Sequence, residues 1–354
     1  MPAKPFEVLC DGLRSADPLV QAEAARLLGE LGSPAAVAPL LDYVRTSRHY
    51  HKAAGYTALG RLGDRSVCAE LRAHVERPGL RDDWYWYGCR AVRACVAVAL
   101  LELGDEAGAD FLRQLADKSD DVFFCWLAPA LLRLGHALPA ARELKGRLTA
   151  QTLTEPGFRR TRHTEPGNMA MKAEALGLIG GPVAAKALLE MMKFHSRCVR
   201  GQAALSLLRA SAGEVPLPSQ LQQANVATVE ALADGDPTDF VRIKAALALA
   251  LLGARHGGRA KFIADLAGRI QDPFDRAVAV EALGLLGSAA YAAAVAGQLD
   301  HEDAYVRQCA LEALERIDPA AAARAAKKAD QDDSPRVRLQ AARILAAQQA
   351  EDKQ

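Results

Sequence analysis

Apolar residues recur along most of the chain at the i, i+3, i+4 and i+7 spacing of one helix face, and most such runs end at a Leu-Gly pair. The segment 236–253, DPTDFVRIKAALALALLG, shows the full form: an acidic turn, a helical run built on Val-Arg-x-x-Ala-x-x-Ala-Leu, then Leu-Gly. In the related run 279–286 the apolar positions nearly encircle the helix, so this helix must be buried on several sides. The pattern predicts a series of buried helices, each stopped by glycine.

The same pattern returns at a regular interval. Gly32 and Gly63 are 31 residues apart, as are Gly104 and Gly135, and the remaining intervals are 31 residues or somewhat longer. Self-similarity at such a period is typical of a solenoid whose units pack only on their neighbours. We expect about ten units within residues 1–350, forming a single solenoid, and a polar C-terminal tail at 351–354.

Each unit is predicted to hold two helices, called A and B here. Helix A begins near a proline such as Pro34, helix B carries the Val-Arg pattern, and glycine ends helix B in a left-handed conformation. Acidic residues in the A–B turn, such as Asp17, Asp272 and Asp303, can cap the free N–H groups of helix B. The pattern places B helices at ranges that include 18–31, 238–252, 273–286 and 303–316.

The motif of 236–253, Asp-x-x-x-x-Val-Arg-x-x-Ala-x-x-Ala-Leu-x-x-Leu-Gly, resembles the HEAT-repeat family, in the short bacterial form also found in phycobilisome-lyase-like proteins. The resemblance implies a right-handed α-solenoid with A helices on the convex side and B helices on the concave side. It also implies a ladder of Asp and Arg side chains between units. The arginines at the matching positions are Arg242, Arg276, Arg307 and Arg338, and the ladder should break where the position holds Gln21, Lys52, Phe124 or Met169.

The composition argues against some classes of function for this chain. The chain has 44 basic and 43 acidic residues and a net charge of +1, so no global field attracts nucleic acid or a membrane surface. It shows no apolar signal core and no run of about 18 apolar residues. The seven cysteines form no CxxC pair, which is typical of reduced, buried side chains. We expect a cytoplasmic protein, and the resemblance suggests a bacterial one.

Two insertions mark a candidate binding site. They extend the A–B turns of the third and fifth units, which should place them on one edge of the solenoid about 20 Å apart. All three tryptophans lie between 84 and 158, and aromatic and arginine side chains dominate binding hot spots. The candidate partner-binding residues are Trp84, Tyr85, Trp86, Tyr87, Phe123, Trp126, Phe158, Arg159, Arg160, Arg162 and His163, with Arg48 and His49 of the second unit extending the surface. Alternatively, the aromatic residues fill the gap beneath the long turns and the arginines are merely solvated.

The expected concave side offers a second candidate. At one B-helix position the early units carry Glu30, Arg61, Glu102 and Arg133, whose alternating charges can pair between neighbouring helices. Later units carry leucine there, and an apolar strip would comprise Leu178, Leu251 and Leu285 with Leu205 and Leu247. Ordinary packing between helices is the simpler interpretation. If the strip is exposed, an amphipathic helix of a partner is its natural ligand.

The sequence carries no signature of catalysis: it has no phosphate-binding loop after a strand, no Gly-x-Ser-x-Gly and no HExxH. His49-x-His51 lacks a third ligand at metal spacing. We therefore expect a scaffold or adaptor that binds another protein and needs no cofactor or metal. Two alternatives remain open, a phycobilisome-lyase-like enzyme or small-ligand binder, and a HEAT-like nucleic-acid-binding protein or DNA glycosylase.

Replacing Trp84, Trp86, Arg159 and Arg160 together by Ala should abolish partner binding and leave the melting temperature nearly unchanged, because the hypothesis places these side chains on the surface. A pull-down from the native host beside a thermal melt checks both. A sharp fall in melting temperature would show that the aromatic side chains are structural plugs instead.

Overall fold

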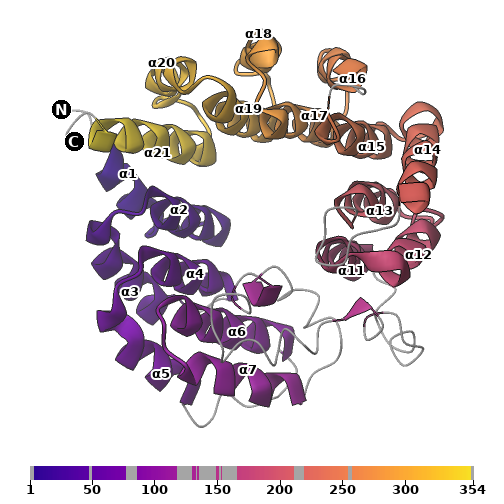
Figure 1. Ribbon diagram of the computed structural model, residues 1–354. Helices are drawn as coiled ribbons and strands as arrows, with labels where there is room; N and C mark the ends of the chain where they lie inside the picture. The colour runs from indigo at the N-terminus through magenta and orange to yellow at the C-terminus, as the bar shows by residue number, and fades with distance from the viewer. Residues whose placement is uncertain are drawn as a thin grey trace. The chain divides into compact units, whose positions relative to one another are not determined.

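The computed structural model describes residues 4–47, 50–76, 86–117, 130–132, 134, 149–150, 153, 166–210, 219–253 and 257–351, and its named elements are helices (Figure 1). The contacts divide the chain into two compact units. Unit 1 comprises Met1–Ser119, Arg133–Lys145 and Ala322–Gln354, and unit 2 comprises Asp120–Leu132 and Gly146–Ala321. Because unit 1 takes up both ends of the chain, the first and last helices belong to the same packed body.

Unit 1 is a two-layer stack of helix pairs. Its helices are α1 (Pro5–Gly12), α2 (Pro18–Leu31), α3 (Val37–Thr46), α4 (Ala53–Leu62), α5 (Cys68–Glu76), α6 (Trp86–Glu102), α7 (Ala107–Asp117) and α21 (Pro335–Glu351). The B helices α2, α4 and α6 pack in series, and α3, α5 and α7 cover one side of them. Helix α20 (Pro319–Ala329) begins in unit 2 and continues into unit 1.

The C-terminal helix α21 packs against α1 and α2 (Figure 1). Leu339 and Ala342 of α21 are buried in the same core as Leu9 and Leu13 of the first repeat. The approach is close at Gly12, where an added Cβ would lie 2.7 Å from Leu339 Cδ2. The apolar side of the first repeat is thus covered by the last helix of the chain.

Unit 2 repeats the two-layer arrangement. Its B layer contains α11 (Pro166–Ile179), α13 (Arg197–Arg209), α15 (Asp239–Leu251), α17 (Pro273–Leu286) and α19 (Ala304–Ile317). Its A layer contains α12 (Gly181–Met191), α14 (Ser219–Gly235), α16 (Gly257–Ala267) and α18 (Ala292–Ala296). Successive B helices pack side by side, with the A helices on one side of that layer.

The sequence-based prediction of an all-α solenoid of two-helix repeats is confirmed. The observed α2 and α17 begin and end at the predicted residues, and α15 and α19 differ by one residue at each end. Gly32 and Gly287 end α2 and α17 with φ of 68° and 64°, the left-handed conformation that glycine adopts without a steric penalty. Asp272 caps α17 as predicted, because its side chain accepts a hydrogen bond from Asp275 N at 2.8 Å.

Four of the neighbouring pairs of B helices touch at a glycine. A Cβ added to Gly29 of α2 would lie 2.8 Å from Ala58 Cα of α4, and one added to Gly284 of α17 would lie 2.6 Å from Ala313 Cα of α19. Gly60 and Gly177 meet the next B helix in the same way, against Ala99 and Ser206. These positions therefore bring the two helix backbones together at the small residue of the next repeat.

The arginines at the repeat positions close the A–B turns. Arg307 Nη1 donates to the carbonyls of His301 and Glu302 at 2.8 and 2.9 Å, and Arg276 Nε donates to the Ile270 carbonyl at 2.7 Å. These hydrogen bonds lie within the turn of the arginine's own repeat, and they are distinct from the contacts between units that the resemblance implies. The same holds for Arg338, which donates to the carbonyls of Asp332 and Asp333.

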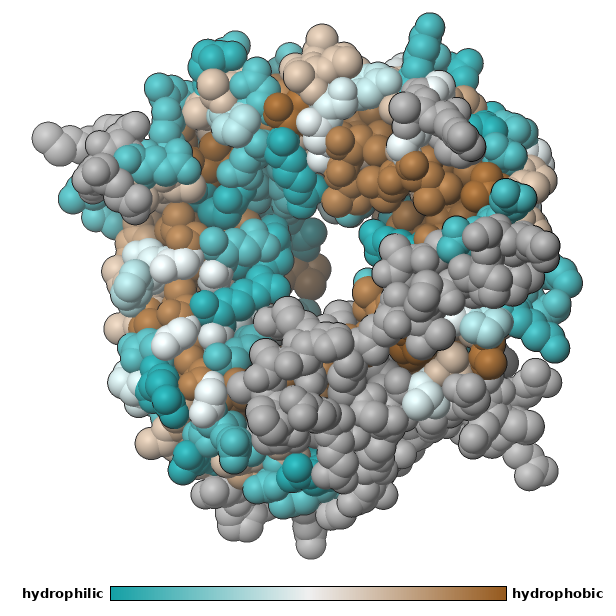
Figure 2. Space-filling model, viewed as in Figure 1, coloured by the Kyte–Doolittle hydropathy of each residue, from teal (hydrophilic) through white to brown (hydrophobic). Residues whose placement is uncertain are grey.

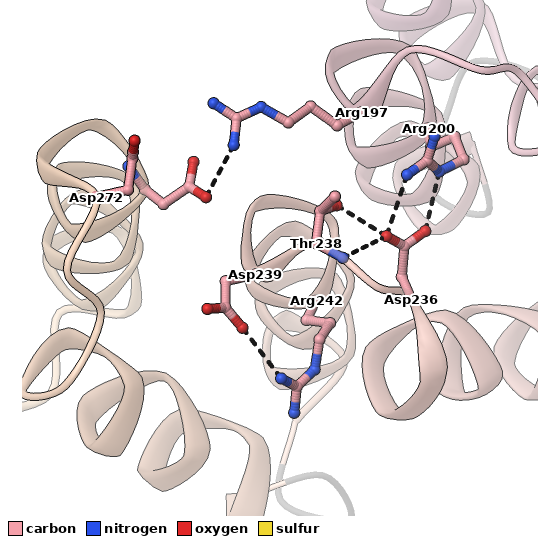
Figure 3. Close-up of polar contacts among 8 residues, drawn as sticks. Arg197, Arg200, Asp236, Thr238, Asp239, Arg242 and Asp272 are labelled. Carbon is pink, nitrogen blue, oxygen red and sulfur yellow. Dashed lines mark hydrogen bonds and ion pairs between the residues drawn. The ribbon is translucent and has the colours of Figure 1, made fainter.

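Arg200 shows the Asp–Arg contact in the form the resemblance implies (Figure 3). Its Nε and Nη2 atoms donate to the two carboxylate oxygens of Asp236 in the next repeat, at 2.9 and 3.1 Å. Arg242, by contrast, pairs with Asp239 of its own helix at 3.0 Å. Burial would raise the pKa of Asp236, but hydrogen bonds from Arg200 and Thr238 outweigh burial and the pKa is lowered.

Gly284→Ala should lower the free energy of unfolding by about 2 kcal/mol, because the new methyl group overlaps the α19 backbone and separates two tightly packed helices. Urea unfolding followed by circular dichroism measures the change. Gly235→Ala is the matched control: a Cβ there meets nothing within 4 Å, so stability should stay within about 0.5 kcal/mol. Equal effects of the two substitutions would contradict the close-approach argument.

Asp236→Asn should cost about 3 kcal/mol at pH 7, because it leaves the partly buried Arg200 guanidinium without its counter-ion. Since the folded-state pKa of Asp236 is lowered, its contribution is complete above the ordinary carboxyl pKa of about 3.9. The difference from wild type should therefore shrink as the pH falls through the lowered pKa. Denaturant titrations at several pH values measure it, and the more exposed Asp239→Asn should cost less than about 1 kcal/mol.

Candidate functional site

The rim site predicted from the two insertions lies outside the described residues. This holds for Trp84, Tyr85, Phe123, Trp126, Phe158, Arg159, Arg160, Arg162, His163, Arg48 and His49. Trp86 and Tyr87 begin helix α6, but their side chains also lie outside the described part. The rim therefore stays a prediction, and the candidate surface is built below from residues the structure describes.

The predicted apolar strip divides into buried and exposed residues. Leu205 and Leu247 are buried at 4% and 0% exposure, so they pack between helices as the simpler interpretation has it. Leu251 and Leu285 are exposed at 49% and 42%. Leu252, which the periodicity did not single out, is exposed beside Leu251 because it lies beyond the last turn of α15. The strip is thus real at the C-terminal ends of α15 and α17.

Exposed arginines flank the strip on both sides. Arg209 lies in the last turn of α13 and Arg316 in the last turn of α19, so the order across four consecutive B helices is Arg209, Leu251, Leu285 and Arg316. Hydrophobic surface gathers over α15 and α17 in the space-filling view (Figure 2). Fully burying a leucine side chain contributes about 1.5–3 kcal/mol, so burying both exposed leucines against a partner would stabilise a complex substantially.

An aromatic row occupies the opposite, N-terminal ends of the same helices. The rings of Phe240 and Phe274 stack with centroids 6.0 Å apart, and those of Phe274 and Tyr305 stack at 6.4 Å. Phe240 is buried, whereas Phe274 and Tyr305 are 44% and 43% exposed. The row crosses α15, α17 and α19, with one ring from each repeat. The three rings occupy the same position in their repeats, so the row follows from the repeat pattern of the sequence.

Arg197 of α13 reaches across α15 to this row. Its guanidinium carbon lies 5.6 Å from the Phe240 ring centroid and 5.8 Å from that of Phe274, within the range of a cation–π contact. Its Nη1 atom donates to Asp275 Oδ2 of α17 at 2.9 Å. One side chain thereby links three consecutive B helices.

Asp275 is an unusual carboxyl group. It is buried, and no hydrogen-bond partner for its Oδ1 atom is present among the described residues. Burial raises its pKa; Arg197 opposes the rise, and the nearby carboxylates of Asp272 and Asp239 add to it. The group therefore combines incomplete hydrogen bonding with a local excess of negative charge.

Unit 1 carries a different, charged surface on its B helices. Arg26 of α2 bridges Glu23 and Glu30 at 2.6 and 2.7 Å, and Arg61 of α4 lies 4.0 Å from Glu30. The predicted pairing of alternating charges is therefore confirmed for Glu30 and Arg61, while Arg133 lies outside the described residues. Such partly exposed pairs contribute little to stability.

The five described cysteines are free, and burial raises the pKa of the Cys95 thiol to about 11. In the part of the chain that the structure describes, no three His, Cys, Asp or Glu side chains come together in a way that could hold a metal ion. None of the described helices is both long enough and apolar enough to cross a membrane.

The structure is similar to several solved ones. An engineered protein matches with 20% identity and a TM-score of 0.36, over 98% of this chain and 99% of the other. Human deoxyhypusine hydroxylase in complex with glycerol matches with 21% identity and a TM-score of 0.37, over 82% and 99%. The phycocyanin lyase complex from Nostoc sp. PCC7120 matches with 18% identity and a TM-score of 0.27, over 97% and 95%.

No curated protein matches the chain in sequence. The family model for HEAT repeats matches residues 6–82 and 261–346. These two stretches contain α2 to α5 and α17 to α20, together with most of α1, α16 and α21. These two regions of the chain are therefore HEAT repeats.

Proposed function

We propose that this protein is an interaction scaffold that binds an amphipathic helix of a partner protein along the leucine strip of unit 2. HEAT repeats generally mediate interactions between proteins. The observation that supports this particular site is the pair of exposed leucines, Leu251 and Leu285, on adjacent B helices between two exposed arginines. The proposal takes the strip as the main contact.

The spacing of the strip suits a helix that crosses the B helices. Packed helices lie about 8–10 Å apart, and two turns of a partner helix advance about 10.5 Å over seven residues. A partner with apolar side chains at i and i+7 therefore places one on Leu251 and the other on Leu285. Acidic residues about one spacing further out on either side would face Arg209 and Arg316 and orient the helix.

The tryptophan- and arginine-rich rim of the second to fifth repeats is retained as a second contact of the same scaffold. Its support is in the sequence alone: two insertions at equivalent turns, with the chain's three tryptophans nearby. A bound tetrapyrrole-like ligand or a nucleic acid is the alternative occupant of that rim. A net charge of +1 does not favour nucleic acid.

Leu251→Glu with Leu285→Glu should deplete the specific partner at least about tenfold in a tagged pull-down from the native host, since the carboxylates would be buried in the contact. Both leucines are exposed, so the melting temperature should hardly change. Val183→Glu, at a similarly exposed apolar residue of the A helix α12, is the matched control and should capture the partner normally.

A captured protein supports the proposal only when its own helix binds. A peptide of that helix should bind wild type and Val183→Glu equally in fluorescence anisotropy, and bind the double variant at least about tenfold more weakly. Replacing the acidic residues of the peptide by amides should weaken binding further. The assignment would be wrong if the double variant captured the partner as well as wild type does. It would also be wrong if the double variant lost a bound small molecule and no protein.

A further inference from the structure

The leucine strip has the same order of residues from either end. Across α13, α15, α17 and α19 the exposed side chains are Arg209, Leu251, Leu285 and Arg316. A partner helix laid across them would meet two leucines between two arginines in either of two opposite directions. The strip by itself therefore does not select the direction of a bound helix.

The residues one helical turn before the strip remove this symmetry. At that position α13 and α15 carry the buried Leu205 and Leu247, whereas α17 and α19 carry the half-buried Glu281 and Glu312. Side chains four residues apart lie on the same face of a helix, about 6 Å apart along its axis. The half of the strip on α17 and α19 is therefore bordered by carboxylates, and the half on α13 and α15 by leucines.

Glu281 is the carboxylate that borders an exposed leucine. It lies four residues before Leu285 on α17, and no ion pair to it is present in the part of the chain that the structure describes. Glu312 already accepts a hydrogen bond from Gln308 at 3.4 Å. The pKa of the Cys309 thiol is raised to about 12, first by burial and then by the carboxylates of Glu312 and Glu281, which places both carboxylates beside α19.

The α15 half of the strip carries the opposite charge. The first charged residue before Leu251 along α15 is Lys244, seven residues away and on the same helix face. Its Nζ atom lies 6.0 Å from the centroid of the Phe240 ring. A basic side chain of a partner would therefore meet a carboxylate beside α17 and a cation beside α15.

We infer that Glu281 sets the direction in which the leucine strip binds its partner helix. This rests on the proposed function, since it takes the strip as the site of an amphipathic helix. The preferred partner carries a basic side chain next to the apolar residue that lies on Leu285, where it pairs with Glu281. In the opposite direction the same basic side chain lies beside Leu247 and closer to Lys244. The partner is thus a helix whose charge is asymmetric along its length.

A single partly exposed ion pair can decide between the two directions. Both directions share the leucine contacts and the flanking arginines, so the ratio between them depends only on the contacts that differ. A pair of this kind favours its own direction by about threefold, although it adds little to the total affinity. The expected effect is therefore a change of orientation rather than a large change of binding strength.

Two synthetic helical peptides of equal composition test the direction. Each carries two leucines seven residues apart, an acidic residue seven positions beyond each leucine, and a nitroxide label at its N-terminus. Lysines stand directly before and after the N-terminal leucine in the first peptide and the C-terminal leucine in the second, with glutamines beside the other leucine. Successive residues point about 100° apart around a helix, so one lysine faces Glu281 whichever side of the peptide borders it.

The label broadens the resonance of the protein leucine that lies closer to the N-terminus of the bound peptide. The full chain carries ¹³C-methyl-labelled leucine, and Leu251→Ile and Leu285→Ile identify the two resonances. The first peptide should broaden Leu285 more strongly and the second Leu251, each with an excess of about threefold or more for one direction. A third peptide with glutamine at all four positions gives the ratio without lysine.

Glu281→Gln keeps the shape of the side chain and removes its charge. Both lysine peptides should then give the ratio of the glutamine peptide, and the melting temperature should stay unchanged. Glu174→Gln is the matched control, because Glu174 is half-buried at the same repeat position on α11, which α13 separates from α15. It should behave like wild type. A preference that survives Glu281→Gln, or that Glu174→Gln abolishes as well, would overturn the role of Glu281.

Failure of the proposed function would give a different result. If neither lysine peptide shifts the Leu251 and Leu285 resonances saturably, the strip does not bind such a helix, and the proposed function and the role of Glu281 are both wrong. If both peptides bind wild type in the same direction, or each in both directions equally, the strip still binds a helix and only the role of Glu281 is wrong.

Discussion

The close contact between successive B helices is the constraint on which the solenoid depends. At Gly29, Gly177 and Gly284 the helix has no side chain, and the next repeat offers alanine or serine, so the backbones approach within a distance that no Cβ would allow. Such packing gains dispersion contacts over the length of both helices. It also explains why a chain rich in alanine and leucine, with few aromatic residues, builds an extensive core. In each unit these contacts set the distance between successive B helices.

A solenoid normally exposes an apolar face at each end, and terminal repeats with polar outer surfaces solve this problem. In unit 1 the problem is met by α21, which places Leu339 and Ala342 in the core formed with α1 and α2. The first repeat therefore needs no separate capping helix. The same packing makes unit 1 discontinuous in sequence, since its last helix follows the whole of unit 2 along the chain.

The two surfaces of unit 2 share a single geometric origin. Phe274 and Leu285 are eleven residues apart on α17, close to three full turns, so they lie on the same side of the helix about 16 Å apart. Neighbouring B helices repeat this arrangement, which sets an aromatic row along one edge and a leucine strip along the other. Between the edges lie charged residues such as Lys244, Glu281 and Glu312. One polypeptide face therefore offers stacking, apolar and charged contacts together.

The sequence by itself determined the repeat, the helix pairs, the glycine stops and the acidic caps. These follow from local rules, because helical periodicity, a left-handed glycine and an N-cap carboxylate depend on residues a few positions apart. It also indicated the leucine position in the B helices. It placed no weight on Phe274 or Tyr305, since an apolar residue at a repeat position is normally core.

Tertiary structure alone decided which of these residues remain exposed and what they meet. Leu247 and Leu251 carry the same side chain four residues apart, yet one is fully buried and the other half exposed. Arg197 pairs with Asp275, 78 residues away, because α13, α15 and α17 pack in series. The contact of α21 with α1 joins the two ends of the chain. Such pairings depend on long-range packing, which local periodicity does not encode.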